Sequence, residues 1–218
     1  MFGHRLPVVL AMGALSAVTG VHLWAQWNDI DRISGPTQPL LMALLALALW
    51  TATEAPRATL VRLTLLALGL SWLGDTAPRF ASGDTAFLLM IGFFLLAQVA
   101  YVRAFLPYAD RSVLHVDRIA LAPYAVAVVL LVAMCAQGAG AMLVPVLVYG
   151  VLLGTMAVLA TGVNGFVWAG GATFLVSDGL IALDAFSEVD VVHNSFWVML
   201  TYVVAQVLIV LGVLETRD

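Results

Sequence analysis

The alternation of apolar and polar residues divides the chain into long apolar segments joined by short polar ones. The apolar segments lack the period-two pattern of a barrel strand, so they predict helices. A helix that crosses a bilayer needs roughly 20 apolar residues, and fewer where the membrane thins. Eight segments qualify: residues 6–26, 39–53, 58–76, 85–105, 119–136, 142–161, 166–183 and 195–214. The sequence therefore predicts an all-α polytopic membrane protein with eight transmembrane helices in a single domain, 1–218.

The composition agrees with this class of protein. Of the 218 residues, 63% are hydrophobic and 10% are charged, whereas a soluble domain is about half apolar and about a quarter charged. Residues 4–27 have the charge and apolar order of a signal sequence, but no small-residue cleavage site follows, so we expect a retained first helix. The single cysteine, Cys135, excludes an intrachain disulfide, and we interpret it as core filler.

The arginines indicate an orientation in the membrane. Loops rich in basic residues face the cytoplasm. With eight spans, one side receives only Arg32 and Arg79, and the loops on that side are acidic. We therefore expect a multi-pass protein of the cell (inner) membrane with both termini in the cytoplasm, on the side that carries Arg5, Arg57, Arg62, Arg103, Arg111, Arg118 and Arg217.

The two halves of the chain share a pattern that favours an internal duplication. A serine and an aspartate come late in the third span of each half, and each second span opens with a proline. Each fourth span contains Ala-Gln-Val, around Gln98 and Gln206. These correspondences suggest two parallel repeats of four helices, over residues 1–110 and 115–218, with spans three and seven equivalent.

Several kinds of chemistry have no support in the sequence. All nine basic residues are arginine, so no lysine can form a Schiff base with retinal or pyridoxal phosphate. The four histidines are scattered, without an i, i+4 pair or a nearby cysteine, so we expect no metal site. A phosphate-binding Gly-Lys-Ser/Thr loop is also absent. We expect no cofactor and no nucleic-acid partner.

Two aspartates need an explanation, because carboxylates are expensive inside or near a hydrocarbon layer. Asp178 comes about a dozen residues into an apolar helix, with roughly five more residues before Asp184 reaches the outer boundary. At a rise of ~1.5 Å per residue, these five residues place Asp178 around 8 Å below the interface, where insertion costs ~2.5–3.5 kcal/mol. Asp75 lies at the end of the third span, which Pro78 and Arg79 close. Asp178 could instead make a structural hydrogen bond, and Asp75 could be solvated at the interface. On parallel helices at similar depth, the two could form a polar pocket with one acid and one base.

Other polar residues of the same spans are candidates to line that pocket. Ser71 precedes Asp75 by four residues, so the two can face the same way, and each glutamine shares a helix face with a tyrosine three or four residues away. Ser177 directly precedes Asp178. Hydrogen bonding and packing between helices are the alternative interpretation. The candidates are Ser71, Gln98, Tyr101, Ser177, Tyr202 and Gln206.

Two further motifs have structural interpretations. Asn164, between the sixth and seventh spans, is expected to cap a helix. Gly150 and Gly154 form a GxxxG motif, which lets two membrane helices approach closely.

Several motifs follow one another along the chain. The first, ending at Asp75, is Gly-Leu-Ser-x-x-Gly-Asp, and Phe-Leu-x₅-Tyr-x₃-Phe follows it in span four. The second, around Asp178, is Gly-Ala-x-x-Phe-x-x-Ser-Asp-x₃-Ala-x₃-Phe, and Tyr-x₃-Gln closes the pattern. With Pro145, Tyr149 and Met156 in span six, these motifs resemble the YhhN-like, lysoplasmalogenase family of integral membrane proteins. Two positions depart from that family, which has a histidine where Gln98 stands and a lysine where Gln38 stands.

The resemblance implies an activity. Lysoplasmalogenases hydrolyse the vinyl ether bond of lysoplasmalogens to a fatty aldehyde and a glycerophospho-base, so the expected partner is a membrane lipid or lysolipid. The resemblance is consistent with Asp75 and Asp178 as the catalytic acid and base, and a pair of carboxyl groups divides the same labour in glycosidases. The sequence is compatible with a homo-oligomer.

Two other functions fit the same pattern. Intramembrane carboxylates and paired halves also suit a small proton-coupled transporter, although a parallel repeat and unbroken spans speak against it. A catalytically inactive lipid-binding membrane protein would keep the family fold without the reaction.

Overall fold

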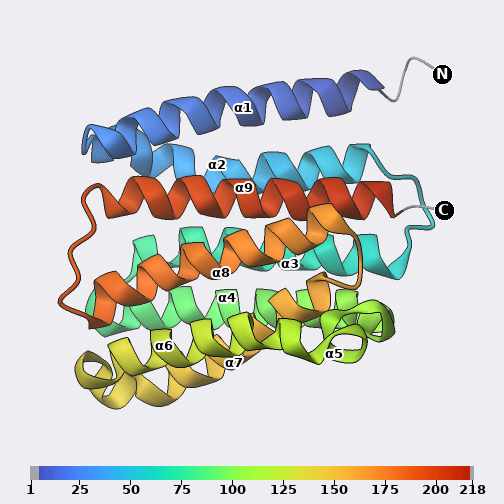
Figure 1. Cartoon of the computed structure of the whole chain (residues 1–218). Coiled ribbons are helices and arrows are strands. Elements are labelled where there is room, and N and C mark those ends of the chain that lie inside the picture. Colours follow the sequence, from blue (N-terminus) through green and yellow to red (C-terminus); the bar gives the residue numbers. More distant parts are fainter. Residues whose placement is uncertain (1–4, 217–218) are drawn as a thin grey trace. The chain divides into compact units, whose positions relative to one another are not determined.

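The structure is a computed structural model that describes residues 5–216, apart from the side chains of Arg5, Cys135, Gln137 and Ala141. The interpretation of Cys135 as core filler therefore falls outside the described residues. Every element that the structure describes is a helix (Figure 1). The long helices are α1 (Arg5–Trp27), α2 (Asp31–Thr51), α3 (Thr59–Thr76), α4 (Gly83–Phe105), α6 (Ala122–Ala139), α7 (Leu143–Ala160), α8 (Gly165–Phe186) and α9 (Asn194–Glu215). The short elements are η1 (Ala77–Phe80), η2 (Leu106–Arg111), α5 (Val113–Val116), η3 (Arg118–Leu121) and η4 (Gly140–Met142).

Helix boundaries agree with the predicted spans to within a few residues, except in α2. The sequence predicts a short span that starts at Pro39, but α2 begins at Asp31 and contains Pro36 and Pro39. A proline inside a membrane helix is tolerated where neighbouring helices and Ser or Thr side chains stabilise the backbone. Here the Thr37 hydroxyl, between the two prolines, donates to the Ile33 carbonyl oxygen at 2.7 Å. The prediction was wrong because it treated a proline as the helix start.

Membrane-spanning helices are confirmed at the level of length and composition. Among the described residues, seven helical segments are long and apolar enough to cross a bilayer, and a shorter apolar stretch covers Arg118–Met134. The eighth span and the internal repeat therefore stay predictions. The seven segments are Leu6–Trp27, Asp31–Thr51, Thr59–Phe80, Gly83–Val116, Leu143–Ala160, Gly165–Phe186 and Asn194–Glu215.

The chain forms two compact units. The first contains α1 to α4 up to Ala104, together with residues 213–216, and the second runs from Phe105 to Gly212. In the first unit, α1 packs along α2, and α2 packs on α3. Its core is aliphatic and fully buried at Leu41, Met42, Leu45, Leu49 and Leu68.

In the second unit, α6, α7 and α8 pack against one another, and α9 packs closely on α8. A Cβ on Gly170 of α8 would lie 2.8 Å from the Ala205 carbonyl oxygen of α9, so only glycine permits this approach. A Cβ on Gly154 of α7 would likewise lie 2.8 Å from Val128 of α6, which agrees with the packing interpretation of the GxxxG motif.

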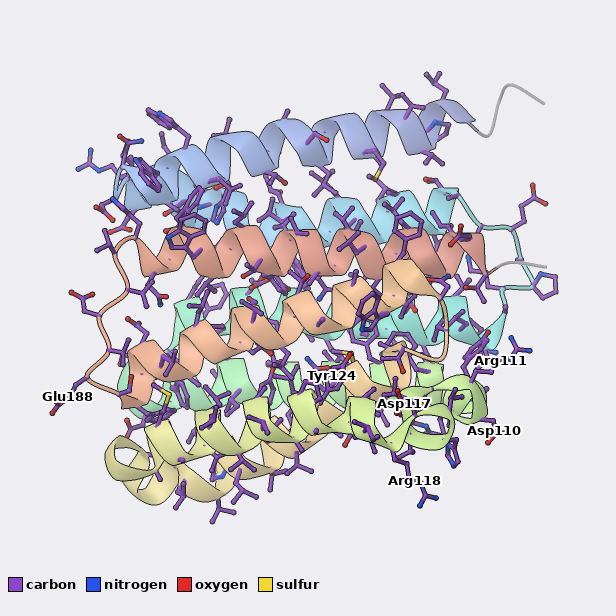
Figure 2. All side chains as sticks on the ribbon, viewed as in Figure 1. Asp110, Arg111, Asp117, Arg118, Tyr124 and Glu188 are labelled. Atoms are coloured by element: carbon purple, nitrogen blue, oxygen red, sulfur yellow. The ribbon has the colours of Figure 1, made fainter. Side chains whose placement is uncertain are left out.

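Charged side chains in the second unit gather at the two ends of its helices. Asp110, Arg111, Asp117 and Arg118 extend from the short linker elements η2 to η3, and Glu188 lies beyond the far end of α8 (Figure 2). The apolar length of the helices between these ends is what a membrane span requires.

Candidate active site

The position of Asp178 is set by the way α8 starts. The predicted cap at Asn164 is confirmed, because its side-chain oxygen accepts a hydrogen bond from the Val167 backbone N–H at 3.0 Å. The Asn164 amide also donates to the Gly212 carbonyl oxygen in α9 at 2.8 Å. One side chain therefore satisfies the first turn of α8 and ties it to the last turns of α9.

Asp178 is buried, with 7% of its surface exposed. Its Oδ2 atom accepts a hydrogen bond from the Tyr149 hydroxyl of α7. Ser177 is fully buried and donates to the Val198 carbonyl oxygen of α9 at 3.1 Å. Ser177 thus contacts α9, and the Asp178 carboxyl group contacts α7.

The predicted residues on α9 lie in the same unit and are also buried. Tyr202 packs edge-on against Phe174 of α8, with the ring centroids 5.8 Å apart and the planes at 87°. Gln206, one turn further along α9, is fully buried. Tyr202 therefore contacts α8 at Phe174, one helical turn before Asp178.

Asp75 is buried as well, which overturns its interpretation as a solvated interfacial carboxylate. It is 7% exposed near the end of α3, and Ser71, one turn earlier, is fully buried. The Gln38 amide of α2 donates to Asp75 Oδ1 at 3.1 Å. The Arg79 guanidinium donates to Gln38 Oε1 at 2.8 Å and to the Asp75 carbonyl oxygen at 3.3 Å. Asp75 is therefore held by a network that crosses from α3 to α2 and returns through η1.

A buried histidine continues this network toward α1. His22 is fully buried, and its Nδ1 lies 2.9 Å from the Thr37 hydroxyl. His22 Nε2 lies 3.5 Å from the Gln26 amide. Thr37 precedes Gln38, so these contacts fix the turn of α2 that reaches Asp75.

The candidates on α4 are buried, and one of them has an unusual environment. Tyr101 and Gln98 are both fully buried. Within the described part of the chain, neither Nε2 nor Oε1 of Gln98 has a hydrogen-bond partner. A buried polar group without a hydrogen-bond partner destabilises the folded state by about 1–3 kcal/mol. We therefore expect the Gln98 amide to lower the free energy of unfolding.

The structure thus forms two local polar clusters, one around each aspartate, and their pairing stays a prediction. Three residues that touch the aspartates were absent from the predicted site: Gln38, Arg79 and Tyr149. Arg79 lies four residues after Asp75, which was the available signal for it, whereas Gln38 and Tyr149 drew attention only through the family motifs. Within the described residues, no group of three or more His, Cys, Asp or Glu side chains could hold a metal ion.

Comparison with known proteins adds one finding. A family model described as YhhN family matches residues 35–213, which is most of the chain. The matched range contains both aspartates and their partners Gln38, Arg79 and Tyr149. Neither the comparison with curated proteins nor that with solved structures gives a match.

Proposed function

Because this chain belongs to the YhhN family, we propose that it is a membrane-embedded hydrolase that cleaves the vinyl ether bond of lysoplasmalogen-type lysolipids. The products are a fatty aldehyde and a glycerophospho-base. Asp75 and Asp178 are the carboxyl groups that we assign to this chemistry. The proposal extends to a multi-pass location in the cell (inner) membrane, with both termini in the cytoplasm and membrane lysolipids as partners.

The reaction needs acid and base catalysis and one water molecule. A carboxylic acid delivers a proton to the vinyl carbon farther from the ether oxygen, which leaves an oxocarbenium ion on the carbon bonded to that oxygen. Water, deprotonated by a carboxylate, adds to this carbon and gives a hemiacetal. Collapse of the hemiacetal releases the aldehyde and the alcohol of the glycerol backbone. A positioned acid or base contributes typically 10²–10⁴-fold to such steps.

The observation that carries the proposal is Asp178, a carboxyl group buried in an apolar helix and bonded to Tyr149. A carboxyl group in a bilayer costs ~2.5–3.5 kcal/mol on insertion scales, and intramembrane carboxylates mark functional sites by default. The Tyr149 hydroxyl donates to Oδ2 of Asp178, and this bond can hold the carboxyl group in one orientation.

Two features of the first unit fit the same role. Gln38 binds Oδ1 of Asp75, and Arg79 holds Gln38 in place, so the carboxyl group has a fixed orientation. A catalytic group held this way needs no reorganisation during the reaction. Gln98, the fully buried amide without a hydrogen-bond partner among the described residues, can supply a donor and an acceptor to a bound substrate.

The test uses two lysolipids that differ in one double bond. Purified protein is given a lysoplasmalogen and the matched saturated alkyl ether lysolipid, and aldehyde release is measured. Only the vinyl ether can accept a proton on carbon, so only it should react. In D₂O the aldehyde, trapped by rapid reduction, should carry one deuterium on the carbon next to the carbonyl carbon.

Three outcomes would count against the proposal. Release of aldehyde from neither lipid removes the hydrolase function, and flux of a labelled solute in proteoliposomes would then favour a transporter. Aldehyde without deuterium would exclude protonation on carbon. Near wild-type turnover by a folded Asp178→Asn or Asp75→Asn protein would remove that residue from the mechanism.

A further inference from the structure

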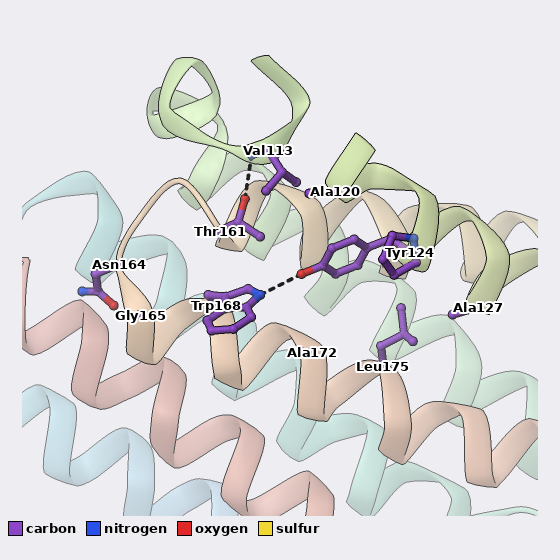
Figure 3. A pocket seen from close by; sticks show the side chains of 11 residues that line it. Val113, Ala120, Tyr124, Ala127, Thr161, Asn164, Gly165, Trp168, Ala172 and Leu175 are labelled. Atoms are coloured by element: carbon purple, nitrogen blue, oxygen red, sulfur yellow. Dashed lines mark hydrogen bonds between the residues drawn. The ribbon is translucent and has the colours of Figure 1, made fainter. Parts of the chain in front are cut away.

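A large apolar groove runs between α6 and α8 in the second unit (Figure 3). Its volume is about 680 Å³, within the range of about 300–1,000 Å³ that small-molecule sites occupy. The α8 side of the groove is formed by Trp168, Ala172 and Leu175, and the α6 side by Tyr124 and Ala127. We call it the α6–α8 groove.

A hydrogen-bonded aromatic pair crosses this groove. The Trp168 indole N–H donates to the Tyr124 hydroxyl at 2.8 Å, so the two rings extend toward each other from opposite walls (Figure 3). Ala127 and Leu175 lie on one side of this pair, and Thr161 lies on the other. We call the pair the Trp168–Tyr124 bridge. It divides the groove into a part near Leu175 and a part near Thr161.

The part near Leu175 leads along α8 toward Asp178. Trp168, Ala172 and Leu175 follow one another at four and three residues, so they form one stripe of the helix. Asp178 comes three residues after Leu175 and is rotated from it by about 60° around the helix, toward Tyr149 of α7. From Trp168 to Asp178 is ten residues, or about 15 Å along the helix axis.

That distance suits a hydrocarbon chain. From carbon–carbon bonds of about 1.5 Å, an extended chain advances about 1.3 Å per carbon, so about 12 carbons reach from Asp178 to the bridge. From the bridge to the end of the groove lining, the walls are formed by Ala127, Ala172 and Leu175, whose side chains offer no polar partner. Lipids surround a membrane-embedded chain, so single-chain lipids have direct access to such a groove.

We propose that the α6–α8 groove holds the hydrocarbon chain of the lysolipid substrate, and that the Trp168–Tyr124 bridge limits its length. The inference rests on the proposed function, because Asp178 fixes where the cleaved bond lies. The groove and the bridge together would determine which chain lengths the protein accepts. Chains that end before the bridge fit the groove, and longer chains must displace it.

The first experiment compares chain-length profiles of aldehyde release. Ala172→Phe and Ala127→Phe fill the groove from opposite walls, and each should lower kcat/KM for long chains relative to short ones by about tenfold or more, the effect of one or more methylenes in an apolar pocket. Trp168→Ala removes the bridge and should shift the profile toward longer chains. Val176→Phe is the matched control, since Val176 is on α8, 51% exposed and outside the groove lining. Unchanged profiles in folded Ala172→Phe and Ala127→Phe proteins would overturn the inference.

The second experiment does not depend on turnover. A single-chain ether lysolipid with a photoreactive diazirine at the end of its chain is crosslinked to the purified protein, and labelled peptides are mapped by mass spectrometry. Labelling of Trp168, Tyr124 or their neighbours, reduced by Ala172→Phe and kept in Val176→Phe, is the expected result. Labelling elsewhere would overturn the inference even if the protein releases aldehyde. Labelling in the groove without aldehyde release would reject the proposed function and keep the groove as a lipid-chain site.

Discussion

The bond between Tyr149 and Asp178 can be measured by Tyr149→Phe, which removes one oxygen and keeps the ring. Asp178 is 7% exposed, so little water is available to replace the lost donor. Hydrogen bonds between membrane helices average about 0.6 kcal/mol, with a maximum near 1.7, whereas bonds to charged groups contribute about 1.5–3 kcal/mol. We expect the free energy of unfolding to fall by about 1–2 kcal/mol, with the upper part of this range for an ionised carboxyl group.

A double-mutant cycle separates this bond from other effects of the substitution. Unfolding in detergent micelles is measured for wild type, Tyr149→Phe, Asp178→Asn and the double variant. Tyr108→Phe, in the linker element η2, serves as the matched tyrosine control. If the two residues act through their hydrogen bond, the coupling energy is about 0.6 kcal/mol or more. Turnover of the lysoplasmalogen should fall in Tyr149→Phe by up to about 100-fold, since a displaced catalytic group costs that much.

Additive effects would refute this reasoning. Independent sites add to within about 0.3–0.5 kcal/mol, so a coupling energy below that range means that the bond contributes nothing measurable. Wild-type turnover in Tyr149→Phe, with folding intact, would show that Asp178 needs no orientation by the phenol.

Three further substitutions test other contacts. Gln98→Met removes the buried amide and should raise the free energy of unfolding by about 1–3 kcal/mol, as measured by thermal unfolding. Aldehyde release should fall in the same variant. A lower free energy of unfolding would show that the amide has a partner in the folded protein. Gln38→Leu should lower stability by about 0.5–1.5 kcal/mol, and in an Asp75→Asn background a similar loss would mean that its bond to Asp75 is unimportant. Gly170→Ala should destabilise the protein, because the added Cβ would meet a backbone oxygen at 2.8 Å. Gly13→Ala should raise the free energy of unfolding by up to about 1 kcal/mol, because an added Cβ there has nothing within 4 Å. Equal effects at the two sites would refute the packing argument.

Local sequence pattern was sufficient for most of the helices. Apolar length predicted eight spans, of which seven are long and apolar enough in the structure to cross a bilayer. Asn164 was recognised as a cap because capping depends on residues close in sequence. The start of α2 was missed for the same reason, since Pro36 and Pro39 are helix breakers by local rules. What keeps them inside a helix is packing against neighbouring helices and the polar contacts of Thr37.

The hydrogen-bond partners of the two aspartates could not be predicted from local sequence pattern. Gln38 is 37 residues from Asp75 in sequence, and Tyr149 is 29 residues from Asp178. Contacts across such separations depend on how helices are rotated against one another, and a single sequence carries no local signal for that rotation. The burial of Asp75 follows from these contacts, which is why its position at a helix end suggested solvation instead. The pairing of Asp75 with Asp178 remains a prediction from the sequence.

The Asn164 amide bond to Gly212 has a consequence for motion. Together with the bond from Ser177 to Val198 and the close approach at Gly170, it joins α8 and α9 at three levels along their length. Regions joined in this way open as one cooperative unit, with a high free energy of local unfolding. We therefore expect Asp178, Tyr202 and Gln206 to move together. For a lipid chain to enter the proposed α6–α8 groove, α6 would then have to move relative to α8.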